Sequence, residues 1–298
     1  MTKPQEILGP MRVPFLVLPP ACVALGAGTA VWTSGEVGIA HVIIAFVGAV
    51  AAHISVNAFN EYFDFRSGLD LRTRPTPFSG GSGTLAARPE AARTALITAS
   101  VALALAALVG IYFLTVWGPV LLPLGLLGLI LIVVYTPWMT HYPFLCLIAP
   151  GLGFGPMMTM GTDVALTGSY TWTAFIASLV PAFLLVNLLL LNQYPDVKAD
   201  ESVGRRNYPM VVGRKNASWI FAASMAAVYL TQIAGWALNL LPAWALLGLG
   251  TLPLGVITVL GAFRYADDLE KLVPYMGFNV ILNIVTPILM AIGLFIAA

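Results

Sequence analysis

The chain has 298 residues, of which 59% are hydrophobic and 9% are charged, and its mean hydropathy is +0.90. A soluble domain carries about 25% charged residues, so this composition excludes a soluble enzyme, a disordered chain and a disulfide-rich secreted scaffold. The formal net charge of +1 points to no nucleic-acid partner. The sequence therefore predicts an all-α integral membrane protein whose main partner is the lipid bilayer.

Stretches without Asp, Glu, Lys or Arg define the expected membrane spans, each about 20 residues long. The nine expected spans are, in chain order, 13–33, 38–64, three within the uncharged stretch 94–162, then 172–195, two within the uncharged stretch 217–263, and 272–298. The turns inside the two long stretches are marked by glycine, proline and asparagine. The sequence thus predicts nine transmembrane helices in one bundle, forming a single domain over residues 1–298.

The basic residues give an independent check on this count. With nine spans and a cytoplasmic N-terminus, all fourteen Lys and Arg residues fall on the cytoplasmic side, while the opposite face keeps only the acids Glu36 and Asp163. Membrane proteins concentrate Lys and Arg in their cytoplasmic loops. The pattern predicts a multi-pass protein with its N-terminus in the cytoplasm.

Acids and amides are grouped at the cytoplasmic ends of the second and the sixth expected spans. Asn60 and Asp64 are four residues apart, so they share one helix face, and Asn57 extends this polar stripe deeper into the span. The second group repeats the four-residue step in Asn192, Asp196 and Asp200. A single acid of this kind could be explained as a side chain at the helix end that reaches towards the membrane surface and pairs with a nearby arginine. Two matching sets instead indicate a functional site, because ionisable groups in apolar spans are costly.

Carboxylate and amide oxygens without His or Cys favour Mg²⁺, which completes its coordination with water and substrate phosphate. The predicted metal ligands are Asn60, Asp64, Asp70, Asn192, Asp196 and Asp200. Basic loops beside each set are expected to hold phosphate oxygens. The arginines in question are Arg72, Arg74, Arg205 and Arg206.

The loops 65–93 and 196–215 are expected to cap this site. The glycine-rich run 79–83 lacks the ending of a Walker loop, and we interpret it as a flexible lid over the site rather than as a plain linker. Four spans separate the two acid sets, which predicts two parallel four-helix repeats plus one helix. Acids gathered at one membrane face favour a cytoplasm-facing chemical site over a transport path at the midplane.

At these motifs the chain resembles the UbiA superfamily of intramembrane prenyltransferases, which have nine helices and two aspartate-rich motifs. The spacing of Asn60, Asp64 and Asp70 is most similar to the menaquinone-type branch. Further matches are Asn192, Asp196 and Asp200 in the second motif, the basic segments 204–206 and 212–215, Met11 to Pro14 at the first helix, and Tyr135 at the end of the fourth. Three departures are Glu61, where many members have Asp, a loop between helices four and five that keeps only His141, and Gly153-Phe154, near a position where naphthoate enzymes often have an acid after Gly.

The resemblance implies Mg²⁺-dependent transfer of a polyprenyl group from an isoprenyl diphosphate to an aromatic acceptor. The expected acceptor is 1,4-dihydroxy-2-naphthoate, in quinone biosynthesis. The alternatives are another UbiA-type enzyme, which would use 4-hydroxybenzoate, homogentisate, a tetrapyrrole or an archaeal glycerolipid precursor, and a non-enzymatic transporter. The implied catalytic residues are Asp64, Asp70, Tyr135, Asp196 and Asp200. The implied substrate-binding residues are Arg12, Asn57, Asn60, Arg72, Arg74, Asn192, Arg205, Arg206 and Lys215.

Overall fold

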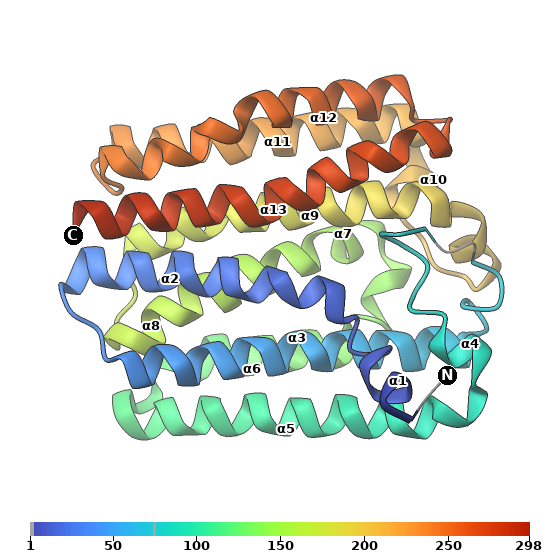
Figure 1. The fold of residues 1–298 in the computed structure, drawn as a ribbon, viewed down its shortest axis with the longest axis horizontal. Helices are drawn as coiled ribbons and strands as arrows, with labels where there is room; N and C mark the ends of the chain where they lie inside the picture. The colour runs from blue at the N-terminus through green and yellow to red at the C-terminus, as the bar shows by residue number, and fades with distance from the viewer. Residues whose placement is uncertain (1–2, 74–75) are drawn as a thin grey trace.

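The structure is a computed structural model that describes residues 3–73 and 76–298, and its described residues form helices and no strand (Figure 1). The long helices lie side by side along one axis. The α-helices are α1 (Lys3–Leu8), α2 (Leu18–Ser34), α3 (Ile39–Ser67), α4 (Thr84–Ala87), α5 (Ala92–Trp117), α6 (Leu122–Val134), α7 (Pro143–Leu152), α8 (Gly161–Thr167), α9 (Trp172–Ser202), α10 (Tyr208–Val212), α11 (Arg214–Ala237), α12 (Leu252–Arg264) and α13 (Leu269–Ala297). Shorter 3₁₀ turns are η1 (Val13–Val17), η2 (Pro89–Ala91), η3 (Gly118–Leu121), η4 (Met139–His141) and η6 (Ala243–Thr251), and η5 (Gly153–Met160) is a π-helix.

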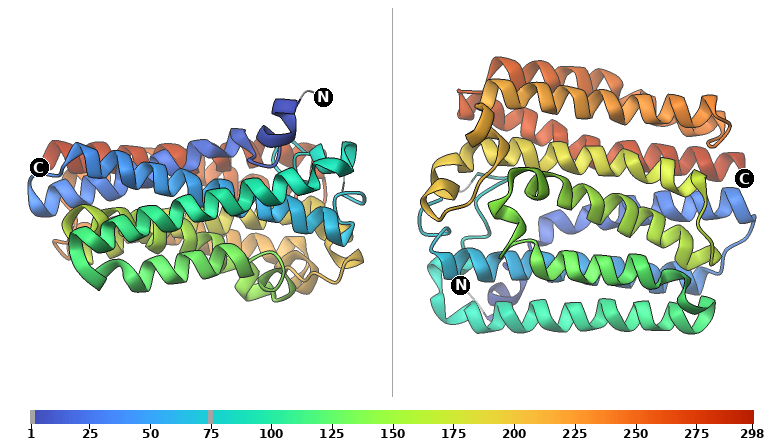
Figure 2. Two further views of the ribbon diagram at one scale, coloured as in Figure 1. Left: turned by 90° about the horizontal axis from the view of Figure 1, so that it is seen from below. Right: turned by 180° about the vertical axis from the view of Figure 1, so that it is seen from behind.

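Eight helical segments among the described residues are long and apolar enough to cross a membrane. They are Val13–Ser34, Ile39–Ser67, Pro89–Val134, Pro143–Thr167, Trp172–Ser202, Arg214–Ala237, Ala243–Arg264 and Leu269–Ala297. The third segment contains both α5 and α6, which the turn η3 folds back against each other (Figure 2). The structure thus shows eight candidate spans where the sequence predicts nine, and one of the eight contains two helices.

Helix ends follow the local sequence. The pair Pro19-Pro20 lies in the first turn of α2, where a missing N–H costs nothing. α3 ends at Gly68, whose φ of 78° supplies the left-handed conformation common at helix C-termini. α9 differs from expectation, because it continues through Pro195 to Ser202 instead of ending near 195. Asp196 and Asp200 consequently lie on a helix and not in a loop.

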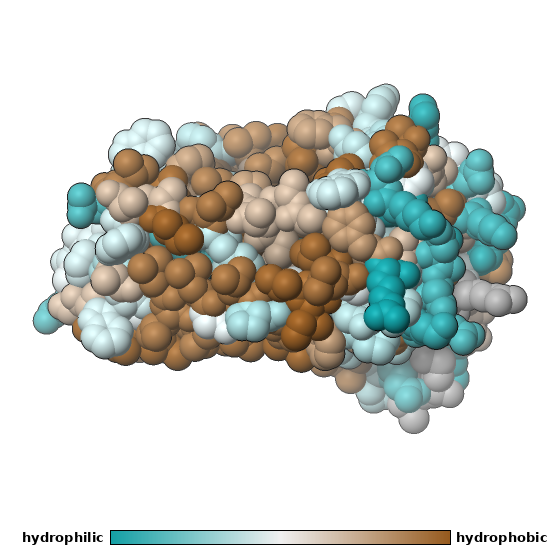
Figure 3. Space-filling view, turned by 90° about the horizontal axis from the view of Figure 1, so that it is seen from above, coloured by the Kyte–Doolittle hydropathy of each residue, from teal (hydrophilic) through white to brown (hydrophobic). Residues whose placement is uncertain are grey.

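α9 is the central helix of the bundle. It packs against α7 and η5 on one side and against α11 and α13 on the other. The largest cluster of buried apolar side chains is built between α9, α11, α12 and α13, whereas α5 and α6 lie at the edge and pack on α3. The surface has a broad apolar band, and hydrophilic side chains gather at the end of the bundle that carries α1, α4 and α10 (Figure 3). The arrangement is that of a bundle set in lipid with one strongly polar end.

Candidate active site

Two helices bring the predicted acids and amides to one cavity of about 650 Å³. α3 contributes Asn60 and Asp64, and α9 contributes Asn192, Asp196 and Asp200. The four-residue step keeps each set on one helix face, and α9 carries the second set because it does not stop at Pro195. The predicted site residues that line the cavity are Arg12, Asn57, Asn60, Asp64, Asp70, Tyr135, Asn192, Asp196, Asp200 and Arg205.

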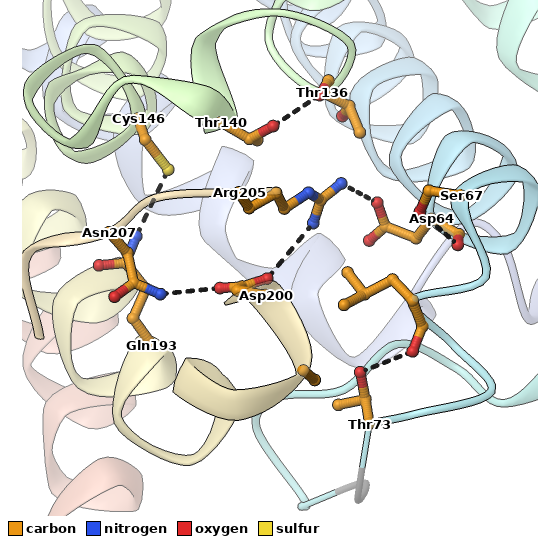
Figure 4. Close-up of polar contacts among 12 residues, drawn as sticks. Asp64, Ser67, Thr73, Thr136, Thr140, Cys146, Gln193, Asp200, Arg205 and Asn207 are labelled. Carbon is orange, nitrogen blue, oxygen red and sulfur yellow. Dashed lines mark hydrogen bonds and ion pairs between the residues drawn. The ribbon is translucent and has the colours of Figure 1, made fainter. Parts of the chain in front are cut away.

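Arg205 lies between the two acid sets (Figure 4). Its Nη2 donates to Oδ1 of Asp64 on α3, and its Nη1 lies 3.8 Å from Oδ1 of Asp200 on α9. Asn207 donates from Nδ2 to the other oxygen of Asp200 at 2.8 Å. Burial by itself would lower the pKa of Arg205, but the neighbouring carboxylates, Asp64 first, outweigh it and raise that pKa above its ordinary value. One arginine therefore compensates an acid from each set.

Other oxygens of the predicted metal ligands lack a partner. Oδ2 of Asp70, Oδ1 of Asn192 and Oδ1 of Asp196 are buried and accept no hydrogen bond within the described structure. Leaving a buried acceptor unpaired is costly. Burial, followed by the charges of Asp64 and Glu61, raises the pKa of Asp70 to about 7. The unpaired oxygens of Asp70, Asn192 and Asp196 therefore favour the binding of an additional cation.

The donor set fits Mg²⁺, because these unpaired atoms are the hard carboxylate and amide oxygens that this ion prefers. Over the described ranges 3–73 and 76–298, however, no three Asp, Glu, His or Cys side chains are grouped closely enough to hold an ion by themselves. Amide oxygens and oxygens of a bound substrate would therefore have to complete the coordination, as is usual for Mg²⁺ sites built from a few carboxylates.

Arg12 enters the cavity from the N-terminal segment. Asn57 donates to the carbonyl oxygen of Met11 at 3.1 Å, which fixes the chain next to α3. Arg12 itself has a left-handed backbone with φ of 51°, and its Nε donates to Oε1 of Glu61 at 2.7 Å. Burial opposes its charge, yet the carboxylates of Glu61 and Asp64 raise the pKa of Arg12. Arg12 is thus a second, partly buried cation at the polar end.

Three of the predicted basic residues are not brought to the cavity. Arg72 is exposed and donates to the carbonyl oxygen of Ser202 at 2.8 Å. Arg206 is exposed as well, although its neighbour Arg205 is not. Lys215 is 77% exposed and lies 3.7 Å from Asp267. A fourth predicted residue, Arg74, lies outside the described residues.

Beyond the polar end the cavity continues along α3 as far as Ala45. The helix between Ala45 and Asp64 is about 28 Å long at 1.5 Å per residue, close to the thickness of a bilayer's hydrocarbon core. α5 and α6 form one wall, where Gly110 and Gly125 keep the space wide: a Cβ on either glycine would meet no atom within 4 Å. The cavity can therefore hold a long apolar group that is polar at one end.

The π-helix η5 forms the opposite wall. Thr159 Oγ1 donates to the carbonyl oxygen of Phe154, five residues earlier, at 2.9 Å, and the Phe154 ring meets the edge of His53 with centroids 4.9 Å apart. η5 approaches α9 closely at Gly155, where an added Cβ would lie 2.5 Å from the carbonyl oxygen of Ser178. π-helical turns often occur at functional sites, and this one lines the apolar cavity.

Tyr135 marks the junction between the polar and the apolar parts. It follows α6 directly and lines the cavity. Burial raises the pKa of its hydroxyl well above the ordinary value. Tyr135 is therefore a neutral phenol at physiological pH.

Sequence reasoning missed two residues of the site. Glu61 is fully buried and holds both Arg12 and the glycine-rich loop. The sequence marks Glu61 only as a departure from the family pattern, although a carboxylate within an apolar span requires partners. Asn207, which orients Asp200, had no signal beyond its place as the N-cap of α10.

Comparisons with known proteins identify the family of this chain. Residues 17–295 match the UbiA prenyltransferase family. The chain is similar to two proteins named 1,4-dihydroxy-2-naphthoate octaprenyltransferase. The one from Bacillus subtilis is 27% identical over 59% of this chain and 56% of its own length, so the match spans little more than half of that relative. The one from Mycobacterium tuberculosis is 24% identical over 90% of this chain and 88% of its own length.

Among solved structures, the fold is similar to that of a UbiA homolog from Archaeoglobus fulgidus bound to GPP and Mg²⁺. The TM-score is 0.64 at 14% sequence identity, over 96% of this chain and 99% of that chain. At this level of identity the likeness concerns the fold.

Proposed function

We propose that this chain, which belongs to the UbiA prenyltransferase family and is an integral, multi-pass membrane protein, transfers a polyprenyl group from an allylic diphosphate to 1,4-dihydroxy-2-naphthoate. The transfer depends on Mg²⁺. The acceptor is supported by the names of the two relatives from Bacillus subtilis and Mycobacterium tuberculosis. The metal and the donor are supported by the Archaeoglobus fulgidus homolog, which is bound to GPP and Mg²⁺.

One observation carries the proposal: a single cavity joins a charged end to a long apolar space. A polyprenyl diphosphate has the same division, with a small, highly charged head on an extended hydrocarbon. In this proposal the diphosphate lies among the acids and arginines, and the prenyl chain lies along α3 between α5, α6 and η5. The lining of each part matches the polarity of the part of the donor that it would hold.

At the polar end, residues from both acid sets would hold the metal. These residues are Asn60, Asp64, Asp70, Asn192, Asp196 and Asp200. Bound Mg²⁺ supplies positive charge that stabilises the departing diphosphate. Arg205 and Arg12 donate to diphosphate oxygens. To do so, Arg205 gives up its contacts with Asp64 and Asp200, whose negative charges the bound metal would then balance. Hydrogen-bond donors aimed at developing charge in a buried site often contribute more to the rate than any other effect.

Cleavage of the bond between the prenyl carbon and the diphosphate oxygen leaves positive charge on the allylic carbon. The neutral ring of Tyr135, at the junction of the two parts of the cavity, can stabilise this cation through its π-face. The apolar walls exclude water that would otherwise capture it. The acceptor ring carbon then forms the new bond to the prenyl carbon and loses the substituent it carried, either a proton or a carboxyl group released as CO₂, which restores the aromatic ring, while the diphosphate keeps the electron pair of the broken C–O bond.

The proposed topology has nine crossings in a single domain over residues 1–298, with α5 and α6 counted separately. The two halves form parallel four-helix repeats, and α13 lies in the ninth crossing. The polar end faces the cytoplasm, because Arg and Lys dominate its loops. The loops 65–93 and 203–213, together with the last turns of α9, cap the site.

Product formation by the purified protein tests this function. The protein, in detergent or lipid, receives geranylgeranyl diphosphate and one acceptor at a time: 1,4-dihydroxy-2-naphthoate, 4-hydroxybenzoate, homogentisate, a tetrapyrrole or a glycerolipid precursor. Each reaction is run with Mg²⁺ and with EDTA. We expect a prenylated naphthoate only with Mg²⁺. If a different acceptor is prenylated, that compound is the acceptor instead of the naphthoate. If the donor binds equally well with Mg²⁺ and with EDTA, the proposed metal site is wrong.

A further inference from the structure

Glu61 is buried on α3, beside the predicted metal ligands, but its environment differs from theirs. Its side chain has 0% exposure. Oε1 accepts from Arg12 Nε at 2.7 Å and from the backbone N–H of Ser82 at 2.8 Å, and Oε2 accepts from Ser82 Oγ at 2.7 Å. Three donors therefore satisfy the carboxylate of Glu61, whereas one oxygen of Asp70 (Oδ2) and one of Asp196 (Oδ1) have no partner among the described residues.

Ser82 belongs to the glycine-rich loop 79–83, whose first three residues line the polar end of the cavity. The loop approaches the acids closely at Gly81, which has φ of +75°. A Cβ there would lie 3.2 Å from both Oδ1 of Asp70 and Oε1 of Glu61. Ser82 Oγ also accepts from the N–H of Thr84 at 3.2 Å. Within the described residues, the hydrogen bonds of Ser82 attach the loop to α3 at the carboxylate of Glu61.

The same carboxylate sets the direction of Arg12. The backbone of Arg12 is left-handed, with φ of 51°. This conformation costs energy for a residue other than glycine, so surrounding contacts must maintain it. Glu61 accepts from Nε, the inner nitrogen of the guanidinium. Hydrogen bonds from the two Nη atoms to other described residues are absent, so these atoms remain available to an anion in the cavity.

We propose that Glu61 is a positioning residue, which fastens the glycine-rich loop over the polar end and aims Arg12 at the anionic head of the substrate. Glu61 is not a metal ligand in this proposal, because its oxygens already have donors. The link to a substrate head rests on the proposed function. The closure of the loop stands on the contacts of Glu61 alone.

Amide hydrogen exchange of the loop, measured on the full-length protein without substrate, tests the closure directly. We expect Ser82→Ala to raise the exchange rates of the 80–84 amides about tenfold or more, since it removes a hydrogen bond to a charged, buried group. Glu61→Gln should do the same, and Glu61→Asp should restore part of the protection. The matched control is Glu90→Gln, which changes an exposed acid close to the loop and should leave exchange unaltered.

Steady-state kinetics of the same variants test the role in substrate binding. We expect KM for the prenyl diphosphate to rise about tenfold in Glu61→Gln, with a smaller change in kcat and an unchanged Mg²⁺ requirement. Unchanged loop exchange in both Ser82→Ala and Glu61→Gln would overturn the proposal, as would a Glu61→Gln variant whose main defect is a higher Mg²⁺ requirement. If the wild-type protein transfers no prenyl group, the proposed function fails, while the exchange data still decide whether Glu61 closes the loop.

Discussion

The guanidinium of Arg205 donates to the carboxylate of Asp64, although 141 positions separate the two residues in the chain. Asp64 ends its set on α3, and Arg205 follows the set on α9, so this ion pair links the two halves of the site. Arg205 also lies near Asp200. A cation shared between two acid sets occupies the region where the proposed reaction needs positive charge.

Arg205→Ala should weaken donor binding strongly. The substitution removes a cation from the proposed diphosphate site and leaves buried carboxylates uncompensated, which typically costs about 3–5 kcal/mol. We expect kcat/KM for the prenyl diphosphate to fall on the order of 10²-fold or more, together with a lower Tm. Arg264→Ala, an exposed arginine on α12, is the control. Equal kinetics for the two variants would show that Arg205 has only a surface role.

Asp64→Asn and Asp196→Asn should each remove turnover. The amide keeps the size of the side chain but loses the charge that attracts Mg²⁺, and we expect losses on the order of 10²-fold or more. Product formation and Tm are measured together, so that inactivity can be separated from unfolding. Wild-type activity in either variant would contradict the assignment of that acid to the metal site.

Gly125→Leu should restrict the length of the donor. Gly125 lines the apolar part of the cavity and faces open space, which a leucine would fill. We expect KM for geranylgeranyl diphosphate to rise roughly tenfold or more, while the shorter geranyl diphosphate is used as before. Ala104→Leu adds a similar volume on the exposed side of α5 and serves as the control. Equal losses for both donors would place the prenyl chain elsewhere.

Gly155→Ala should destabilise the fold. The new Cβ would meet the backbone oxygen of Ser178 and the Cβ of Ala182 at 2.5 and 2.7 Å, and overpacking of this kind costs about 1–3 kcal/mol. The measurement is Tm in detergent. Gly153→Ala is the matched control, because its Cβ would approach only Leu131, at 3.5 Å. A Tm drop of the same size in both would show that contact with α9 is not responsible, because Gly153 lacks that contact and Ala has the higher helix propensity.

The sequence was sufficient where periodicity carries the information. The four-residue steps at Asn60 and Asp64 and at Asn192, Asp196 and Asp200 predicted two polar helix faces, and both line one cavity. The extent of α9 was harder to predict. Proline usually ends or kinks a helix, but Tyr194, next to Pro195, is buried and donates to the carbonyl oxygen of Arg214, and such packing maintains the helix.

Loop side chains were the least predictable part of the site. Arg205 and Arg206 are chemically equivalent in the sequence, yet only Arg205 lines the cavity. The backbone N–H of Arg206 donates to the carbonyl oxygen of Thr140 at 3.1 Å, and this contact with another loop fixes which of the two points inward. Lys215 likewise pairs with Asp267 far along the chain. Which basic side chain points into the cavity depends on tertiary contacts, and the local sequence pattern around each residue does not reveal them.

The cavity uses only part of the bundle. Within the described structure, no residue of α2, α11, α12 or α13 lines it, and α9 stands between the cavity and α11 to α13. α9 therefore connects the part of the bundle that lines the cavity to α11 and α13, which do not. We expect changes in α11 to α13 to raise or lower thermal stability without altering which donor or acceptor is used. These helices are therefore the region in which to engineer a more thermostable enzyme of unchanged substrate selectivity.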